Sequence, residues 1–186
     1  MFILGLTGTI GSGKSTVARF LVENGFIWYE IDKIAHQFLE NSSPIYSKVI
    51  ELFGTNNRSE IRKQAFNKPE KLIFLNKIIH PLIKKKIAEN IKKEKQNAKI
   101  VLDAALLFEI GLDAYSNKII AIISSEKNIK NRIKKERGLN YSLTEKIISS
   151  QKSSNFFKEN SDFIIENNHS LENLEEEIRK LLPKLY

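Results

Sequence analysis

The chain has 186 residues, of which 41% are hydrophobic and 28% charged, and this composition predicts one globular domain with a sizeable core. Its 30 Lys and Arg against 22 Asp and Glu give a net charge of +8, which favours polyanionic partners such as nucleotides or nucleic acid without choosing between them. The absence of cysteine excludes a disulfide framework, a thiolate metal site and a cysteine nucleophile. We expect a soluble cytoplasmic protein, because no stretch approaches the ~20 apolar residues of a membrane span.

Apolar runs and helical patterns alternate along the chain. Residues 2–6 predict a buried strand, 8–13 a turn, 15–24 a helix and 26–31 a second strand. Later apolar runs predict strands at 99–102, 118–123 and 163–165, before a final helix from about 171 to 182. Strands that alternate with helices predict an α/β fold, a doubly wound parallel sheet flanked by helices, with ligands at the carboxyl ends of the strands.

Two helical stretches interrupt this alternation. The first, over 33–97, is too long for a simple crossover and is punctuated by Pro44, Gly54, Pro69 and Pro81, each placed where a helix is expected to begin or end. The second covers 126–155. We therefore expect a single domain, 1–186, with its core in 1–32, 98–125 and 156–186 and two helical excursions from it.

A glycine-rich motif follows the first strand. The residues Gly8-Thr9-Ile10-Gly11-Ser12-Gly13-Lys14-Ser15 match G-x-x-x-x-G-K-[ST] between a predicted strand and a predicted helix, as a phosphate-binding loop (P-loop) requires. Glycines let backbone N–H groups turn toward phosphates, Lys14 can reach the β- and γ-phosphates, and Ser15 can offer its hydroxyl to Mg²⁺. A glycine turn that only caps a helix would not need Lys14 and Ser15 at these positions. The nucleotide-binding residues expected here are Gly8, Gly11, Ser12, Gly13, Lys14, Ser15 and Thr16.

The sequence narrows the class of P-loop protein. Guanine-specific enzymes usually carry an Asn-Lys-x-Asp run after a strand, and this chain has none. It is short for a motor ATPase, and its basic residues lack the interleaved aromatics of an RNA-binding signature. A small-molecule kinase is the remaining class.

Two acidic residues follow predicted strands. Asp32, after the second strand, can accept a proton from an acceptor hydroxyl or orient that hydroxyl, although it also suits the N-cap of a helix beginning near Lys33. Asp103, after the third strand, has the form of a Walker B acid that holds Mg²⁺, or serves as a turn or cap residue.

Over nearly its whole length the chain resembles the dephospho-CoA kinase family. The similar segments, in chain order, are Gly5-Leu6-Thr7-Gly8 running into the P-loop, Asp32, Ile34-Ala35, Phe53-Gly54, His80-Pro81-Leu82-Ile83, Leu106-Leu107-Phe108-Glu109, Arg132, Arg137, Gln151, Asp162-Phe163-Ile164-Ile165 and Asn167. The resemblance implies transfer of the γ-phosphate of ATP to the ribose 3′-hydroxyl of dephospho-CoA, with Mg²⁺ as cofactor.

The resemblance also assigns roles to residues and segments. It implies that 33–97 binds the acceptor and that 126–155 is a lid, whose Arg132 and Arg137 stack on adenine or clamp the phosphates. Asn167 would contact the adenine largely through its backbone, or serve a turn. On the acceptor side the residues implied are Asp32, Arg58, His80 and Leu106, although a lone His such as His80 is as often structural.

Two other functions are compatible with the sequence. Another nucleoside or nucleotide kinase would share the P-loop and lid but use a different acceptor pocket. A nucleotide-dependent nucleic-acid-binding module would explain the charge of +8 without a small acceptor. With dephospho-CoA kinase as the leading hypothesis, we expect ATP and dephospho-CoA as partners, neither membrane nor nucleic acid, and a monomer as the default.

Overall fold

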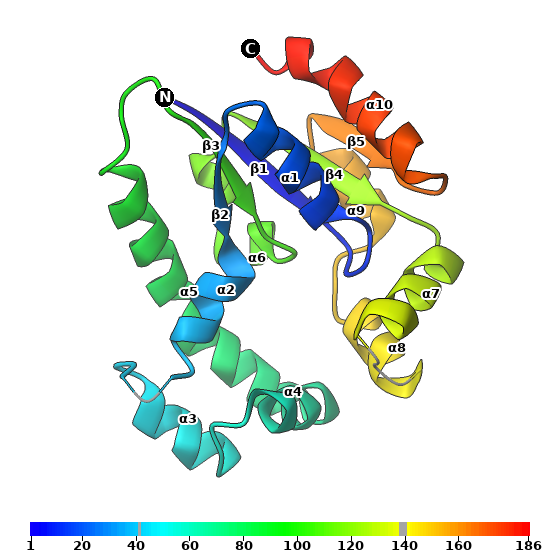
Figure 1. The fold of residues 1–186 in the computed structure, drawn as a ribbon. Helices are drawn as coiled ribbons and strands as arrows, with labels where there is room; N and C mark the ends of the chain where they lie inside the picture. The colour runs from blue at the N-terminus through cyan, green and yellow to red at the C-terminus, as the bar shows by residue number, and fades with distance from the viewer. Residues whose placement is uncertain (41, 138–140) are drawn as a thin grey trace. The chain divides into compact units, whose positions relative to one another are not determined.

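The structure, a computed structural model, describes residues 1–40, 42–137 and 141–186, without the side chains of 135–137 and 141. The chain divides into two compact units, one formed by Met1–Tyr29 with Lys95–Tyr186 and the other by Glu30–Glu94. The first unit carries a sheet whose five strands, in the order β2-β3-β1-β4-β5, are β1 (Phe2–Gly8), β2 (Ile27–Glu30), β3 (Lys99–Asp103), β4 (Lys118–Ile123) and β5 (Phe163–Glu166) (Figure 1).

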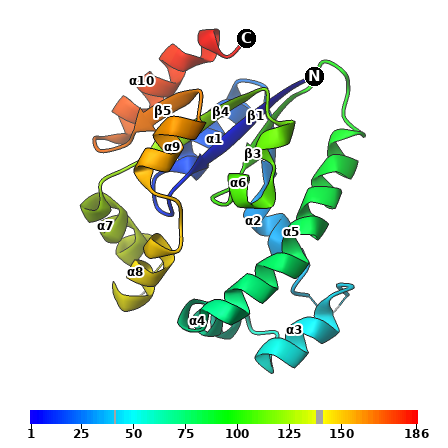
Figure 2. The ribbon, with the colours of Figure 1, turned by 180° about the vertical axis from the view of Figure 1, so that it is seen from behind.

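The sheet is parallel where β1 pairs with β3 and β4, and where β4 pairs with β5. Because side chains alternate between the two faces of a strand, each face needs its own cover. Leu4 and Leu6 of β1 pack with the apolar sides of α1 (Lys14–Glu23) and α10 (Leu171–Leu181). Ala121 and Ile123 of β4 pack instead with Phe157 of α9 (Ser154–Asn160), on the face shown in Figure 2. The predicted α/β fold, a sheet flanked by helices, is therefore confirmed.

The remaining elements of this unit connect the strands. Two short helices, α6 (Leu107–Ile110) and η1 (Asp113–Tyr115), lie between β3 and β4, and η2 (Leu182–Lys184) follows α10. After β4 come α7 (Glu126–Arg137) and α8 (Tyr141–Ser149), which pack on each other. An ion pair of 3.2 Å between Lys130 and Glu145 links these two helices.

The second unit is helical. It contains α2 (Ile31–Gln37), α3 (Tyr46–Phe53), α4 (Arg58–Asn67) and α5 (Pro69–Ile91), and both α2 and α4 pack on α5. The long helix α5 buries a stripe spaced four residues apart, formed by Leu75, Ile79, Ile83 and Ile87. This spacing places the four buried side chains on one side of the helix.

Several predicted boundaries differ from the structure, those of the strands by one or two residues. Pro81 does not begin or end a helix, because α5 continues through it. A proline inside a helix costs roughly 3 kcal/mol, and burial of side chains such as Ile79 and Ile83 on either side offsets that cost. The second strand ends at Glu30 rather than 31, and Ile31 is the buried first residue of α2.

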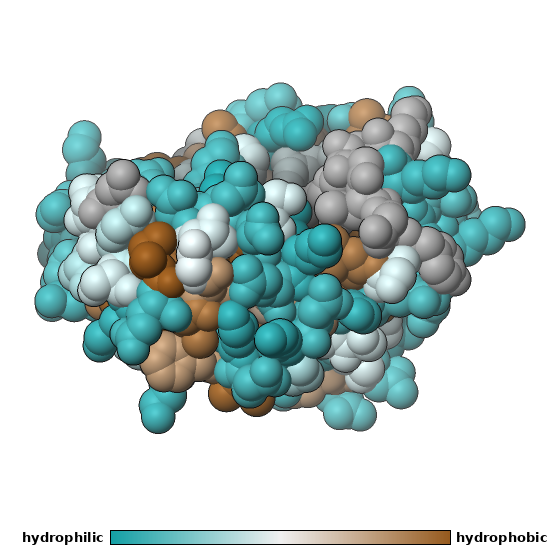
Figure 3. Space-filling view, turned by 90° about the horizontal axis from the view of Figure 1, so that it is seen from below, coloured by the Kyte–Doolittle hydropathy of each residue, from teal (hydrophilic) through white to brown (hydrophobic). Residues whose placement is uncertain are grey.

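Charged and polar side chains cover much of the surface. Hydrophilic residues dominate the face seen in Figure 3, and apolar side chains form small groups among them. Over the described ranges, no helix combines the length and the apolar character needed to cross a membrane.

Candidate active site

The predicted phosphate-binding loop joins the end of β1 at Gly8 to the start of α1 at Lys14. None of its three glycines, Gly8, Gly11 and Gly13, can be replaced without strain, because each has a positive φ. Gly8 has a φ of 133°, and a Cβ there would lie 2.0 Å from the Ile122 carbonyl oxygen. Gly13, the N-cap of α1, has a φ of 105°, and a Cβ would lie 2.4 Å from Nδ2 of Asn167. The backbone of β4 and a side chain after β5 therefore press directly against the loop.

The loop presents hydrogen-bond donors that the protein leaves unused. The N–H groups of Gly11 and Gly13 donate to no acceptor within the described part of the chain, and the buried Ser12 hydroxyl has no partner there either. Such groups are costly to bury unpaired, and they suit an anion at the positive end of α1. The loop thus fits the phosphates of a nucleotide.

Lys14 adds a positive charge to this cradle. Its ammonium donates to the carbonyl oxygens of Gly8, at 2.9 Å, and Thr9, at 3.0 Å. These bonds hold the charge against the first residues of the loop rather than in bulk solvent. A half-buried ammonium at this position can meet phosphate oxygens over a short distance.

Arg132 and Asn167 form a bridge behind the loop. The Arg132 guanidinium donates to the carbonyl oxygens of Gly11, at 3.3 Å, and Ser12, at 3.4 Å, and to both oxygens of Asn167, at 3.1 and 3.2 Å. The buried Asn167 amide donates in turn to the Ser12 carbonyl at 2.8 Å. Arg132 and Asn167, both predicted to bind the nucleotide, thus lie beside the loop and donate hydrogen bonds to its carbonyl groups. The side chain of Arg137, predicted for the same lid, lies outside the described residues.

Asp103 is the last residue of β3, the strand next to β1, and Leu106 follows that strand. Asp103 pairs in register with Leu6, two residues before the loop begins, and only 6% of its surface is exposed. Leu106 is half-buried at the start of α6. Both residues lie at the carboxyl edge of the sheet, as predicted.

Three of the predicted acceptor residues, Asp32, Arg58 and His80, lie in the helical unit, which begins at Glu30 and so includes Asp32 as well as part of 33–97. Asp32 is exposed in the first turn of α2, whose N-cap is Glu30, so the alternative that Asp32 caps this helix is wrong. His80 is half-buried within α5 rather than at a helix boundary, because that helix continues past Pro81. Arg58 begins α4, where the Asn57 side chain caps the helix by accepting from two backbone N–H groups.

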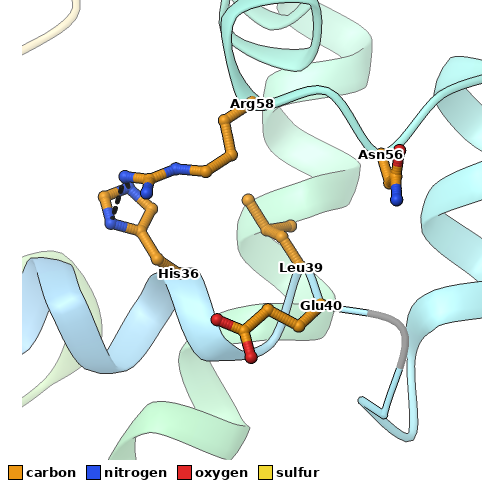
Figure 4. A pocket seen from close by; sticks show the side chains of 5 residues that line it. All are labelled: His36, Leu39, Glu40, Asn56 and Arg58. Carbon is orange, nitrogen blue, oxygen red and sulfur yellow. Dashed lines mark hydrogen bonds between the residues drawn. The ribbon is translucent and has the colours of Figure 1, made fainter.

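Arg58 contacts a residue that the sequence did not point out. Its Nη2 atom lies 2.5 Å from Nδ1 and 2.8 Å from Nε2 of His36, as Figure 4 shows. Both side chains line a pocket of about 300 Å³ together with Leu39, Glu40 and Asn56. The position of His36 four residues after Asp32 places both on one face of α2, which is the signal that could have found it.

The contact depends on the charge of His36. Burial, and then the positive charges of Arg58 and Arg62, lower the pKa of His36, against the opposing effects of Asp32 and Glu30. A guanidinium can only donate hydrogen bonds, so a ring nitrogen of His36 must accept. The neutral imidazole is therefore the form that holds Arg58.

The fold and the loop together define a class of protein. A parallel sheet with a glycine-rich loop between β1 and α1, and Lys14 held at that loop, is the architecture of the P-loop kinases. The family model for dephospho-CoA kinase matches residues 2–173. The chain belongs to the dephospho-CoA kinase family.

Curated relatives agree with this assignment, and solved structures share the fold. The dephospho-CoA kinase of Fusobacterium nucleatum is 38% identical, over 97% of this chain and 96% of its own length. That of Carboxydothermus hydrogenoformans is 35% identical, over 98% and 93%. A solved structure from Thermus thermophilus, 26% identical, superposes with a TM-score of 0.80 and covers 100% of this chain and 98% of its own. The Acinetobacter baumannii shikimate kinase, at 14% identity and a TM-score of 0.54 over 99% and 94%, shares the fold alone.

Proposed function

We propose that this enzyme transfers the γ-phosphate of ATP to the ribose 3′-hydroxyl of dephospho-CoA, the last step of coenzyme A synthesis. The hydroxyl oxygen forms a bond to the γ-phosphorus, the bond from that phosphorus to the β–γ bridging oxygen breaks, and ADP leaves. The observation that carries the proposal is the phosphate loop, with its unpaired donors and Lys14, in a chain of this family. Phosphoryl transfer depends mainly on positioning and on charge stabilisation, which these groups supply.

On the donor side, the backbone N–H groups of Gly11 and Gly13 would hold the phosphates, and Lys14 would stabilise charge on the transferring group. Arg132 and Asn167 support this role, because their bonds to Gly11 and Ser12 place them beside the same loop. We propose that they lie on the adenine side of the bound ATP, and that Arg137 joins them from the lid.

Mg²⁺ fits the residues at the end of the loop. Ser15 is exposed in the first turn of α1, and Asp103 ends the adjacent strand β3. Hydroxyl and carboxylate oxygens are ligands that Mg²⁺ accepts, with phosphate oxygens and water completing its shell. We propose that Ser15 and Asp103 hold the ion, directly or through water, and that the bound ion neutralises charge on the β- and γ-phosphates.

On the acceptor side, we propose that Asp32 takes the proton of the attacking hydroxyl. Its exposed carboxylate, free of an N-cap role, is available for this task. Arg58, His80 and Leu106 would bind dephospho-CoA. The pocket that Arg58 and His36 line offers a cationic group suited to an anionic part of that substrate.

A panel of acceptors tests the proposed function. We expect the kcat/KM for dephospho-CoA to exceed that for AMP, UMP, CMP and adenosine by orders of magnitude, because the helical unit supplies surface that a nucleotide base alone cannot use. The measurement is ADP formation with each acceptor at fixed ATP and Mg²⁺. Equal or better turnover of a nucleoside monophosphate would favour the alternative nucleotide kinase instead. ATP hydrolysis stimulated by DNA or RNA would favour the nucleic-acid-binding module.

The His36–Arg58 contact predicts a pH dependence for acceptor binding. The folded-state pKa of His36 is lowered, so the neutral form dominates above the ordinary value of 6.5 and is lost as the pH falls through the lower folded value. Protonated His36 repels the Arg58 guanidinium and can no longer accept a hydrogen bond from it. As the pH falls from about 8 through this lowered pKa, we expect the KM for dephospho-CoA to rise roughly tenfold.

The matched control for this pH dependence is His36→Gln, whose amide cannot titrate but can still accept from Arg58. In that variant the KM for dephospho-CoA should rise much less at low pH than it does in the parent. An identical KM profile in the variant and the parent would show that His36 does not control Arg58.

We also propose that the enzyme acts in the cytoplasm, where ATP is made and where a chain without cysteine needs no oxidising environment. A monomer is our working assumption for its assembly state.

A further inference from the structure

The lid contacts the phosphate loop through a residue to which the proposed mechanism gives no role. Gln151 lies between α8 and α9, near the end of 126–155. Its side-chain oxygen Oε1 accepts a hydrogen bond of 2.9 Å from the backbone N–H of Ile10, the third residue of the motif. The contact is partly buried and joins residues that are 141 positions apart in the sequence. Both residues belong to the same compact unit.

The same short piece of the loop is held from the other end of the lid. Arg132 in α7 donates to the carbonyl oxygens of Gly11 and Ser12. The side chain of Ile133 packs so closely that a Cβ on Gly11 would lie 3.1 Å from its Cγ1 atom. Residues 10–12 are thus held at an N–H group by Gln151, near the end of the lid, and at two carbonyl groups by Arg132, near its start.

The bond from Ile10 also controls the direction of a neighbouring carbonyl. The peptide unit between Thr9 and Ile10 is planar, so an N–H that points at Gln151 forces the Thr9 carbonyl to point the opposite way. That carbonyl accepts from the Lys14 ammonium at 3.0 Å and from the Ser12 N–H at 3.2 Å. Rotation of this one peptide unit would therefore remove an acceptor from Lys14 and loosen the turn at Ser12.

We propose that Gln151 is a positioning residue for ATP. By holding the Ile10 N–H it fixes the peptide unit whose carbonyl orients Lys14, and it thereby couples the end of the lid to the phosphate loop. This inference rests on the proposed function, since it assumes that the loop binds ATP. It gives Gln151 no contact with the reacting atoms.

Gln151→Met tests the proposal, because methionine matches the length of glutamine and lacks the accepting oxygen. Loss of one such hydrogen bond is expected to speed amide exchange at Ile10 about tenfold in the protein without nucleotide. The KM for ATP should rise and kcat should fall, each by roughly tenfold, while the KM for dephospho-CoA stays unchanged. The measurements are residue-resolved hydrogen exchange and steady-state kinetics with each substrate varied.

Two further variants make the result decisive. Gln151→Glu keeps an accepting oxygen, so it should restore slow exchange at Ile10, although its added negative charge should still raise the KM for ATP. Asn155→Leu removes an exposed amide from the same end of the lid and should leave exchange at Ile10 and all kinetic constants unchanged.

Each remaining outcome has a distinct meaning. Exchange at Ile10 and ATP kinetics within about twofold of the parent in Gln151→Met would overturn the proposal, as would a lowered melting temperature with unchanged kcat and KM, which is the result of a purely structural contact. If the parent protein itself bound no ATP, the proposed function would fall, whatever the exchange at Ile10 showed.

Discussion

Replacement of Lys14 by alanine should abolish measurable phosphoryl transfer while the protein remains folded. The ammonium is held at the loop by two carbonyl oxygens, so its charge is already in place before the transition state forms. Removing a preorganised charge of this kind lowers kcat by roughly 10³-fold or more. The measurement is ADP formation with dephospho-CoA as acceptor, together with a thermal melt.

The fold should survive this change because the loop has other support. Asn167 still holds the Ser12 carbonyl, and Gln151 still holds the Ile10 N–H. Lys180→Ala is the matched control, since it removes an exposed lysine that pairs only with neighbours on α10 among the described contacts. That control should keep normal turnover, and near-normal turnover in Lys14→Ala would mean that the loop does not bind the transferring phosphate.

Local sequence patterns predicted the elements that depend on local forces. The strand from Lys118 to Ile123 has the predicted bounds. A continuous apolar run of this length is typical of a strand that is buried on both faces of a parallel sheet. The phosphate loop was predictable for a related reason, since its glycines meet a backbone requirement that is visible in the sequence. Gly8 and Gly13 indeed have positive φ values of 133° and 105°.

Tertiary packing decided the features that the sequence did not predict. Pro81 marks a helix boundary by local rules, yet the buried stripe around it keeps α5 intact. The contacts of Gln151 with Ile10 and of His36 with Arg58 join residues that are far apart in the chain. The sequence around Gln151 or His36 contains no pattern that identifies the residue it contacts. Arg132 was predicted as a nucleotide-binding residue, but its hydrogen bonds to the loop carbonyls depend on the fold and could not be predicted from the sequence.

Asp32→Asn should lower kcat by roughly 10²- to 10⁴-fold and change the KM of either substrate little. Asparagine keeps the shape and most of the hydrogen bonding of aspartate but cannot take a proton from the attacking hydroxyl. The measurement is steady-state kinetics with ATP and dephospho-CoA each varied in turn. A kcat within a few-fold of the parent would remove Asp32 from the catalytic residues.

A structural role for Asp32 predicts a different result. Because Glu30 is the N-cap of α2 and Asp32 lies in the first turn, the structural role left to Asp32 is electrostatic. Its charge interacts with His36 and with the positive end of the helix, the latter worth about 0.3–1 kcal/mol. Its loss would lower the melting temperature slightly and leave kcat intact. Glu60→Gln provides the comparison, because Glu60 is also an exposed acid in the first turn of a helix, α4, in the same unit. If both variants lose similar stability and only Asp32→Asn loses turnover, the carboxylate of Asp32 acts in the reaction rather than in the fold.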